Sequence, residues 1–129
     1  PLGAFQNQRS FCSIANVCYV VNQILEREDT PSGVYNLADD ETLSTNELIE
    51  LIATSTNRKA RIFPIPKKLI NTIAKIGDIL HLPLNTERLD KLTENFVVSN
   101  LKIKAVLGIE KLPVTSKEGL VKTFKSFTK

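Results

Sequence analysis

Hydrophobic residues recur three and four positions apart along most of the chain, which is the spacing of one face of an α-helix. This pattern predicts about five helices and a short further one over residues 86–92. The longer helices are expected at 17–25, 44–57, 66–80, 99–108 and 115–127. Each has a hydrophobic face and a polar face, so each must pack against another layer of structure.

Two pairs of residues have the spacing of a capping box at the start of a helix. Ser44 precedes Glu47, and Thr115 precedes Glu118, by three positions. In this arrangement each side chain of a pair accepts a hydrogen bond from a backbone N–H that has no partner within the helix. These pairs predict helix starts near residues 44 and 115.

Single residues mark other helix ends. Asn16 is expected to cap the first helix, and Asn57 to close the second. Pro66 can open the third helix in its first turn, and Pro83 ends the hydrophobic pattern of that helix. Gly108 is expected to end the helix that begins after Ser99 or Asn100.

Four short segments have the residue pattern of strands. They are 9–14, 34–37, 60–65 and 96–98. Segments so short and so far apart do not make a self-sufficient sheet. We therefore expect an α/β fold class, in the form of a mainly helical lobe whose sheet lies mostly in another part of a larger protein.

The composition is typical of one folded domain, with 129 residues, 42% hydrophobic and 24% charged. No apolar run is long enough to cross a bilayer and no secretory leader opens the sequence, which predicts a cytoplasmic protein without membrane contact. Cys12 and Cys18 lie among apolar residues, and we expect buried thiols rather than a disulfide or metal site. The chain begins with Pro1 instead of Met, which favours a piece of a longer protein.

Positive charge is concentrated towards the end of the chain. The net charge is +3, and residues 101–129 contain seven lysines against Glu110 and Glu118. A lysine-rich end can bind an acidic polymer or an acidic protein surface. A solvated lysine face is the favoured interpretation, and nucleic-acid binding is not expected, because no arginine cluster or interleaved aromatic residues accompany the lysines.

Most motifs of cofactor and metal sites are missing from the sequence. The five glycines do not have the spacing of a dinucleotide or phosphate loop. His81 has no acid at a metal-ligand interval, so we expect a structural or surface histidine. The acidic run 39–41 is expected to form a solvated turn before a helix start. A divalent-metal site is the alternative, and it needs more oxygen ligands than this run supplies.

One polar group stands out at the start of the chain, where Asn7, Arg9 and Ser10 precede Phe11 in a strand-like segment. An arginine at the lip of a sheet can offer its planar fork of N–H groups to two phosphate oxygens at once. From these residues alone a surface salt bridge is the favoured interpretation, and phosphate binding is the alternative.

Eight segments of the chain follow one another in an order that resembles a known enzyme family. They are Asn7-x-Arg9-Ser10-Phe11, residues 33–38, 43–48 and 61–66, Arg88-Leu89, Phe96-Val97-Val98, Lys104-x-x-Leu107-Gly108 and Glu118-Gly119-Leu120. In this order they resemble the C-terminal half of NAD-dependent nucleotide-sugar epimerases and dehydratases, in the extended branch of the short-chain dehydrogenase/reductase family. The nearest subgroup is that of the UDP-glucose 4-epimerase-like enzymes of surface-polysaccharide synthesis. The resemblance extends to about Phe124.

This resemblance implies a Rossmann domain followed by a smaller lobe that closes over a sugar nucleotide. The implied reaction oxidises the sugar with tightly held NAD and then returns the hydride to the other face. The glycine motif and the catalytic Tyr-x-x-x-Lys of the family belong to an N-terminal part that we expect to be absent here. Tyr19 is followed four residues later by Gln23, and Tyr35 by Asp39, so neither has the required lysine. We expect no catalytic residue and no bound NAD in this chain alone, and a homodimeric parent.

Few individual residues carry over from the family. Arg9 matches the arginine that contacts the diphosphate of the nucleotide. Arg88 stands where relatives often have a second basic residue near the nucleotide, with a helix-surface salt bridge as the alternative. Asn16 matches an Asn or Asp of the family, although a helix cap is favoured. Ala15 stands where the family often has an acid, which weakens any polar role at that position.

Three hypotheses about function follow. The chain is the substrate-binding portion of a sugar-nucleotide epimerase, dehydratase or reductase; or it is a non-enzymatic module whose lysine-rich end binds a protein or acidic polymer; or it is a truncated product with no function of its own.

Overall fold

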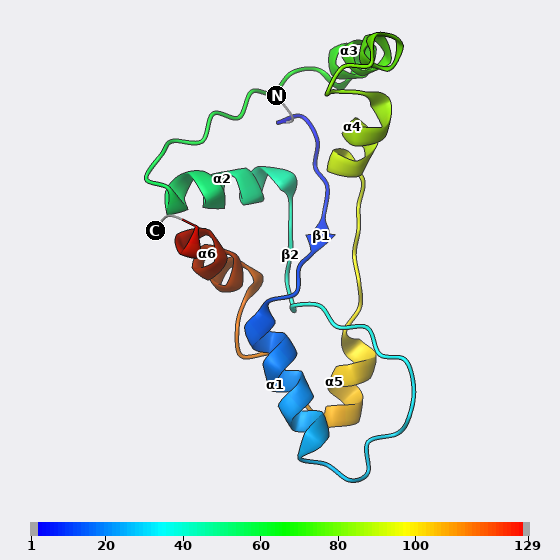
Figure 1. The fold of residues 1–129 in the computed structure, drawn as a ribbon, viewed down its shortest axis with the longest axis vertical. Coiled ribbons are helices and arrows are strands. Elements are labelled where there is room, and N and C mark those ends of the chain that lie inside the picture. The colour runs from blue at the N-terminus through cyan, green and yellow to red at the C-terminus, as the bar shows by residue number, and fades with distance from the viewer. Residues whose placement is uncertain (1–2, 128–129) are drawn as a thin grey trace.

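The computed structural model describes residues 3–127, which form an elongated molecule of six helices and two short strands (Figure 1). The helices are α1 (Ile14–Leu25), α2 (Thr45–Ser55), α3 (Lys67–Leu80), α4 (Thr86–Thr93), α5 (Leu101–Leu107) and α6 (Ser116–Ser126), and the strands are β1 (Arg9–Ser10) and β2 (Thr42–Leu43). In Figure 1, α3 and α4 occupy one end and α1 and α5 the other, with the strands, α2 and α6 between them. The expectation of a mainly helical α/β lobe fits this content, and residues 3–127 contain no Rossmann-type sheet.

The strands meet in the middle of the molecule. β1 pairs with β2 in antiparallel orientation, with Arg9 opposite Leu43 and Ser10 opposite Thr42. On its other side, Arg9 forms an isolated parallel bridge with Phe96. The segment that contains Arg9 is therefore the central one of three, although only β1 and β2 form a regular ladder among the described residues.

The sequence predicted more and longer strands than the structure contains among the described residues. The expected strand 9–14 is two residues long, because Ile14 already begins α1. Residues 34–37 form no strand, residues 60–65 none longer than a single bridge, and 96–98 contribute the Phe96 bridge alone. A strand is stabilised by hydrogen bonds to a neighbour, and these segments have too little neighbouring sheet to extend along.

Four helix ends that depend on nearby residues were predicted correctly. Ser44 with Glu47, and Thr115 with Glu118, form complete capping boxes. Asn57 adopts the left-handed conformation (φ 54°) just after α2, and Gly108 does so (φ 62°) at the end of α5. Most residues avoid this conformation because their β-carbon comes too close to the backbone. Gly108 has no β-carbon and Asn is one of the few other residue types that tolerate it, which explains why these two residues stand at these positions.

The predicted cap of α1 is wrong. Ser13, and not Asn16, caps this helix, because the Ser13 hydroxyl accepts a hydrogen bond from the backbone N–H of Asn16. Asn16 lies inside the helix and is completely buried. Its amide is used in tertiary contacts, described below.

Two separate hydrophobic clusters form the interior. Val20 of α1, Ile103 and Leu107 of α5 and the loop residue Leu112 make the first. The second is smaller and lies between α3 and α4, with Ile70, Ala74 and Leu89 at its centre.

Much apolar surface stays outside these clusters. On α3, residues 69, 73, 76, 79 and 80 are all exposed, although each is Leu or Ile. The solvent-accessible surface area is 9104 Å², about a third more than the roughly 6,800 Å² expected for a compact monomer of this mass. The helices thus have hydrophobic faces that nothing in residues 3–127 covers.

Candidate functional site

Arg9 lies in a short strand, as the sequence predicted, and this strand lies between β2 and the Phe96 bridge. Alternation along the strand places its side chain on the face that also carries the buried Leu43. The Arg9 side chain is partly buried, and no residue in 3–127 forms a hydrogen bond or ion pair with its guanidinium. The alternative of a surface salt bridge is therefore not what the structure contains. Within the described part of the chain, the five N–H donors of the guanidinium are thus left for water or a ligand.

The other polar residues beside Arg9 are structural. The Asn7 amide donates hydrogen bonds to the backbone carbonyls of Leu92 and Glu94, and its oxygen accepts one from the N–H of Thr45. Asn7 thereby joins the end of α4 to the start of α2. Ser10 exchanges two hydrogen bonds with the backbone of Val98. Of this polar group, only Arg9 is without a partner among the described residues.

Arg88 is placed differently from Arg9. It lies in the first turn of α4, next to the α3 end of the molecule, whereas Arg9 lies in the middle beyond the other end of α4 (Figure 1). Its guanidinium donates to the backbone carbonyl of Pro83 at 2.8 Å. This contact stabilises the turn between α3 and α4 in place of the expected salt bridge. No contact brings the two arginines together.

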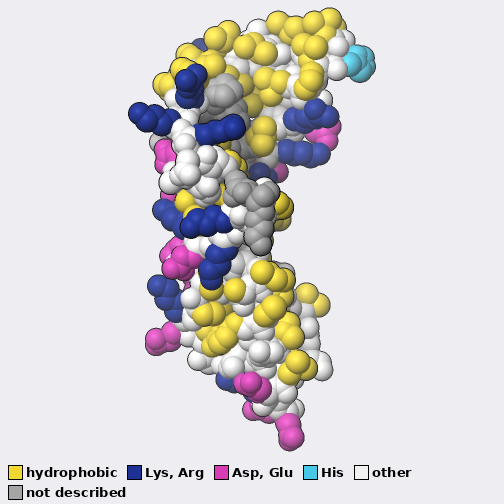
Figure 2. All heavy atoms as spheres, turned by 60° about the vertical axis from the view of Figure 1, so that its left-hand side comes forward, with side chains coloured by type: hydrophobic (Ala, Val, Ile, Leu, Met, Phe, Trp, Pro, Cys, Tyr) yellow, Lys and Arg dark blue, Asp and Glu magenta, His cyan; other side chains and the backbone are white. Residues whose placement is uncertain are grey.

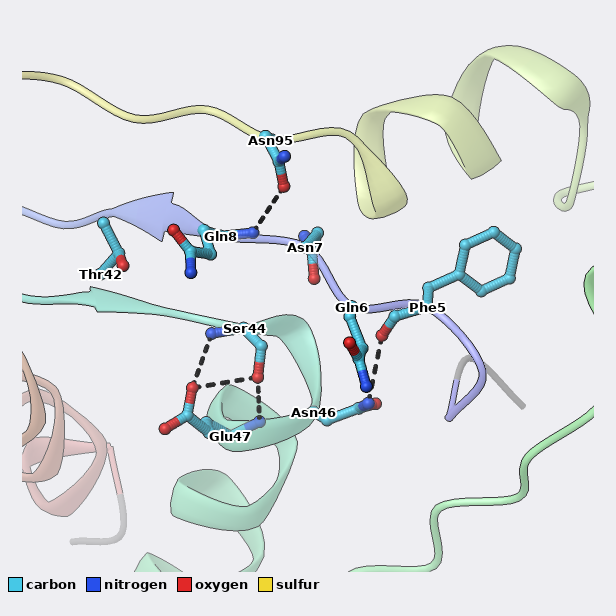
Figure 3. A pocket seen from close by; sticks show the side chains of 9 residues that line it. All are labelled: Phe5, Gln6, Asn7, Gln8, Thr42, Ser44, Asn46, Glu47 and Asn95. Carbon is cyan, nitrogen blue, oxygen red and sulfur yellow. Dashed lines mark hydrogen bonds between the residues drawn. The ribbon is translucent and has the colours of Figure 1, made fainter.

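A polar pocket of about 490 Å³ opens between the β1 segment and the start of α2 (Figure 3). Its lining consists mainly of uncharged polar side chains: Gln6, Asn7, Gln8, Thr42, Ser44, Asn46 and Asn95, with Phe5 and Glu47. Figure 3 shows the Gln6 side chain pointing towards Asn46 at the start of α2, and the Phe5 ring turned away from the other side chains.

Arg9 does not line this pocket. Gln8 and Thr42 lie on the opposite face of the strands from Arg9, because side chains alternate between the two faces. Glu47 is the one charged residue of the lining, and hydrogen bonds from Ser44, with the nearby Lys117, lower its pKa below 4.5 despite some burial. An ionised carboxylate repels phosphate, so the pocket suits neutral hydrogen-bonding groups rather than a diphosphate.

The acidic run 39–41 is not the solvated turn that the sequence predicted. Asp39 is buried and accepts hydrogen bonds from the backbone N–H of Ser13 and from the Asn16 amide, the latter at 2.7 Å. The same amide also donates to the Val114 carbonyl, and its oxygen accepts from the Val114 N–H. Asn16 and Asp39 thus join the start of α1 to two distant loops.

Asp40 extends this network on the α5 side. Its carboxylate accepts hydrogen bonds from Asn100, from Lys104 at 2.6 Å and from the N–H of Leu112. Asn100 also donates to the Ala38 carbonyl. We name Asn16, Asp39, Asp40 and Asn100 the polar clamp. Its hydrogen bonds join residues that are 23 to 98 positions apart in the sequence, so no local sequence pattern indicates it. No metal-ligating cluster of three or more acidic, Cys or His residues occurs within 3–127.

The cysteines are exposed, contrary to the prediction that they are buried. Cys12 lies between Phe11 and Ser13, but the turn into α1 leaves it at the surface. Partial burial and then the negative charge of Asp39 raise the pKa of the Cys12 thiol above 9.0, which keeps it protonated and unreactive at neutral pH. His81 ends α3 in a left-handed conformation, in line with the structural or surface role expected for it.

The lysines of the C-terminal region do not make one uninterrupted basic surface. Lys104 is paired with Asp40, Lys117 lies 3.4 Å from Glu47, and Lys102 donates to a backbone carbonyl. Figure 2 shows Lys and Arg side chains scattered from the upper to the lower part of one face, several of them beside acidic ones, with hydrophobic side chains at the α3–α4 end and again over the lower half. This arrangement gives the interaction-module hypothesis no particular support.

No helix among residues 3–127 has the length and apolar character needed to span a membrane. Comparison of the chain with family models, with curated proteins and with solved structures found no match in any of the three.

Proposed function

We propose that the chain is the C-terminal substrate-binding portion of an NAD-dependent nucleotide-sugar epimerase of the UDP-glucose 4-epimerase kind, and that Arg9 binds the diphosphate of the sugar nucleotide. The observation that carries this proposal is the unpaired guanidinium of Arg9 on the central strand, at the position that matches the diphosphate-binding arginine of the family. Structural residues hold the strand on both sides, so the arginine is firmly positioned for a ligand.

The uncovered apolar surface also supports the proposal. The helices expose Leu and Ile faces, most of all on α3, and the total surface exceeds that of a compact monomer. A lobe that closes against a larger domain has such faces, because the other domain completes its core. In this proposal the Rossmann part of the parent enzyme covers some of them.

The residues of this chain do not themselves fit NAD. A dinucleotide site of this family needs a glycine-rich loop between a parallel strand and a helix. The described sheet is antiparallel, and the glycines lie at positions 3, 33, 77, 108 and 119, without the spacing of such a loop. In this proposal NAD and the catalytic Tyr and Lys belong to another part of the protein, and this chain contributes binding alone.

Calorimetric titration with UDP-glucose and UDP-galactose tests the role of Arg9. We expect Arg9→Ala to weaken binding by about 1.5–3 kcal/mol, which is tenfold or more, because a charge-assisted contact with phosphate is lost. Arg9→Lys should recover only part of the affinity, since an ammonium group lacks the planar fork that pairs with two phosphate oxygens.

Arg61→Ala is the matched control, because Arg61 is an exposed arginine without a hydrogen bond to any of residues 3–127. It removes the same charge and should leave affinity nearly unchanged. Arg88→Ala should have a smaller effect than Arg9→Ala, because the Arg88 guanidinium is already engaged with Pro83. Equal affinities for the Arg9 and Arg61 variants would show that Arg9 has no specific role in binding.

A further inference from the structure

Phe96 lies beside Arg9 on the same face of the small sheet. The N–H of Ser10 donates to the Phe96 carbonyl, and the N–H of Phe96 donates to the Gln8 carbonyl, both at 2.8 Å. These two bonds define a parallel bridge between Arg9 and Phe96. The side chains of bridge partners project from the same face of a sheet, from backbones roughly 4.8 Å apart.

The Phe96 ring is held in position and yet exposed. Its backbone N–H and carbonyl both form hydrogen bonds with the segment that contains Arg9, while 59% of the residue is accessible to solvent. The cation–π pairs within 3–127 are Lys67 with Phe5 and Lys102 with Tyr35, so Arg9 does not stack on this ring. As far as residues 3–127 are concerned, an exposed aromatic ring and a guanidinium without a partner therefore project from adjacent segments on one face.

We propose that Phe96 is a stacking platform for the base of a nucleoside diphosphate whose phosphates bind Arg9. This inference rests on the proposed function and adds to it a residue and a part of the ligand. Arg9 alone would accept any phosphate, because its contacts are to phosphate oxygens. A neighbouring aromatic ring selects ligands that also have a flat aromatic group, since every nucleobase has a face that can stack.

The opposite face of the strands suits the base and phosphates less well. It carries the neutral amide groups of the pocket and the ionised Glu47, and it has no positive charge in its lining. On the Arg9 face, the cross-strand neighbour Leu43 is buried. Asn7 and Ser10, the polar residues of the same segment, already have hydrogen-bond partners. Arg9 and Phe96 are thus the two groups of this sheet left to contact a charged aromatic ligand.

Titration of the ¹⁵N-labelled protein with UDP and, separately, with inorganic pyrophosphate tests this inference, with binding followed by NMR chemical shifts. We expect Phe96→Ala to weaken UDP binding roughly tenfold, because base stacking is lost, and to leave pyrophosphate binding unchanged. Phe96→Tyr keeps the ring and should restore UDP affinity. Phe63→Ala is the matched control, since Phe63 is also 59% exposed but lies outside the small sheet.

The outcomes separate this inference from the function on which it rests. If Arg9→Ala weakens UDP binding but Phe96→Ala does not, the platform is wrong and the role of Arg9 stands. If Phe96→Ala weakens UDP and pyrophosphate binding equally, the residue maintains the strand and is no base platform. If the unaltered protein binds neither UDP nor pyrophosphate, the proposed function itself fails.

Discussion

The α1–α5 end and the α3–α4 end of the molecule differ in how far along the chain their contacts reach. At the first end, α1 and α5 pack around Val20 and Ile103, and the polar clamp joins them to loops far away in sequence. The amide of Asn16, for example, reaches the backbone of Val114. Assembling this end therefore requires most of the chain to be in place.

The α3–α4 end is a local hairpin. Its helices follow one another directly, and its cluster consists of Ile70, Ala74 and Leu89. Of the two partly buried residues packed against it, Ile65 is close in sequence and only Phe5 comes from a distant segment. The turn between the helices is held by hydrogen bonds from Thr86 to Asp78 and from Arg88 to Pro83. Among the described residues, a single buried polar side chain, Asn7, joins the end of α4 to the start of α2, whereas the polar clamp holds the other end with several.

The contrast separates two kinds of hydrophobic surface. At the α1–α5 end a hydrophobic cluster packs around Val20 and Ile103 and buried polar groups fix one arrangement, although Ile14, Leu25 and Leu101 stay exposed. At the α3–α4 end the exposed face of α3 has no such partner in residues 3–127. We therefore expect the first end to determine the stability of the chain, and the second to open on its own and to gain most from any additional covering.

The strongest test of this contrast is Asn16→Ala. The change removes the Asn16 hydrogen bond to the buried Asp39 carboxylate, which keeps only its contact with the Ser13 N–H among the described residues, and it leaves the Val114 N–H and C=O without their side-chain partner. Buried polar groups without partners are expensive, and we expect a loss of about 3 kcal/mol in the free energy of unfolding. Urea unfolding monitored by circular dichroism measures this loss.

Asn71→Ala is the matched control, because Asn71 also lies within a helix but is exposed on α3. Ala favours helices more than Asn does, so the control should be neutral or slightly stabilising. Similar losses for the two variants would mean that the polar clamp does not hold the α1–α5 end together.

A second test, with a smaller expected effect, is Gly77→Ala in α3. A β-carbon at this position would lie 1.8 Å from the backbone carbonyl oxygen of Leu84, so α3 and the following turn must move apart. The strain should exceed the helix-propensity gain of up to about 1 kcal/mol and leave a net loss of about 2 kcal/mol. Amide hydrogen exchange should locate the loss in α3 and α4, with protection of α1 and α5 unchanged.

Gly33→Ala serves as the control for Gly77→Ala. A β-carbon at position 33 meets the Tyr35 ring at an ordinary 3.7 Å, so we expect little change in stability or exchange. If Gly77→Ala instead increases exchange equally at both ends, the hairpin and the α1–α5 end unfold as one unit and the contrast between them disappears.

The same contrast explains which features the sequence could predict. Both capping boxes and the left-handed Asn57 and Gly108 depend on residues within one turn of helix, and all four were predicted correctly. The cap of α1 was wrong because the Ser13 hydroxyl, three positions earlier, takes the role expected of Asn16.

Long-range contacts were beyond prediction. The acidic run 39–41 looked solvated because the partners of Asp39, Ser13 and Asn16, lie 26 and 23 positions earlier in the sequence. The strand position of Arg9 was predicted from local alternation. Its neighbour Phe96 was not, because their bridge joins residues 87 positions apart and needs the fold to bring them together.

The third test concerns the pH dependence of stability, and its expected effect is the smallest of the three. Burial raises the pKa of Asp40, but hydrogen bonds from Lys104, Leu112 and Asn100 outweigh this and lower it below 3.8. A lowered pKa in the folded state stabilises the fold at neutral pH, and this contribution is lost as the pH falls through the folded-state value. We expect Asp40→Asn to cost about 1 kcal/mol at pH 7, a modest value because water reaches part of the carboxylate. The difference from the unaltered protein should shrink as the pH falls below 3.8.

Asp78→Asn makes the matched change at the α3–α4 end. Hydrogen bonds from the Thr86 hydroxyl and N–H also lower the pKa of Asp78, but this carboxylate is fully exposed. The direction of its pH dependence should therefore be the same and its size smaller, since water can replace the lost hydrogen bonds. Urea unfolding of both variants at pH 7 and pH 3 measures the two dependences, and other acids cancel when each variant is compared with the unaltered protein. A larger pH-dependent loss for Asp78→Asn than for Asp40→Asn would reverse the order of the two ends, because the local turn would then hold the chain more firmly than the polar clamp.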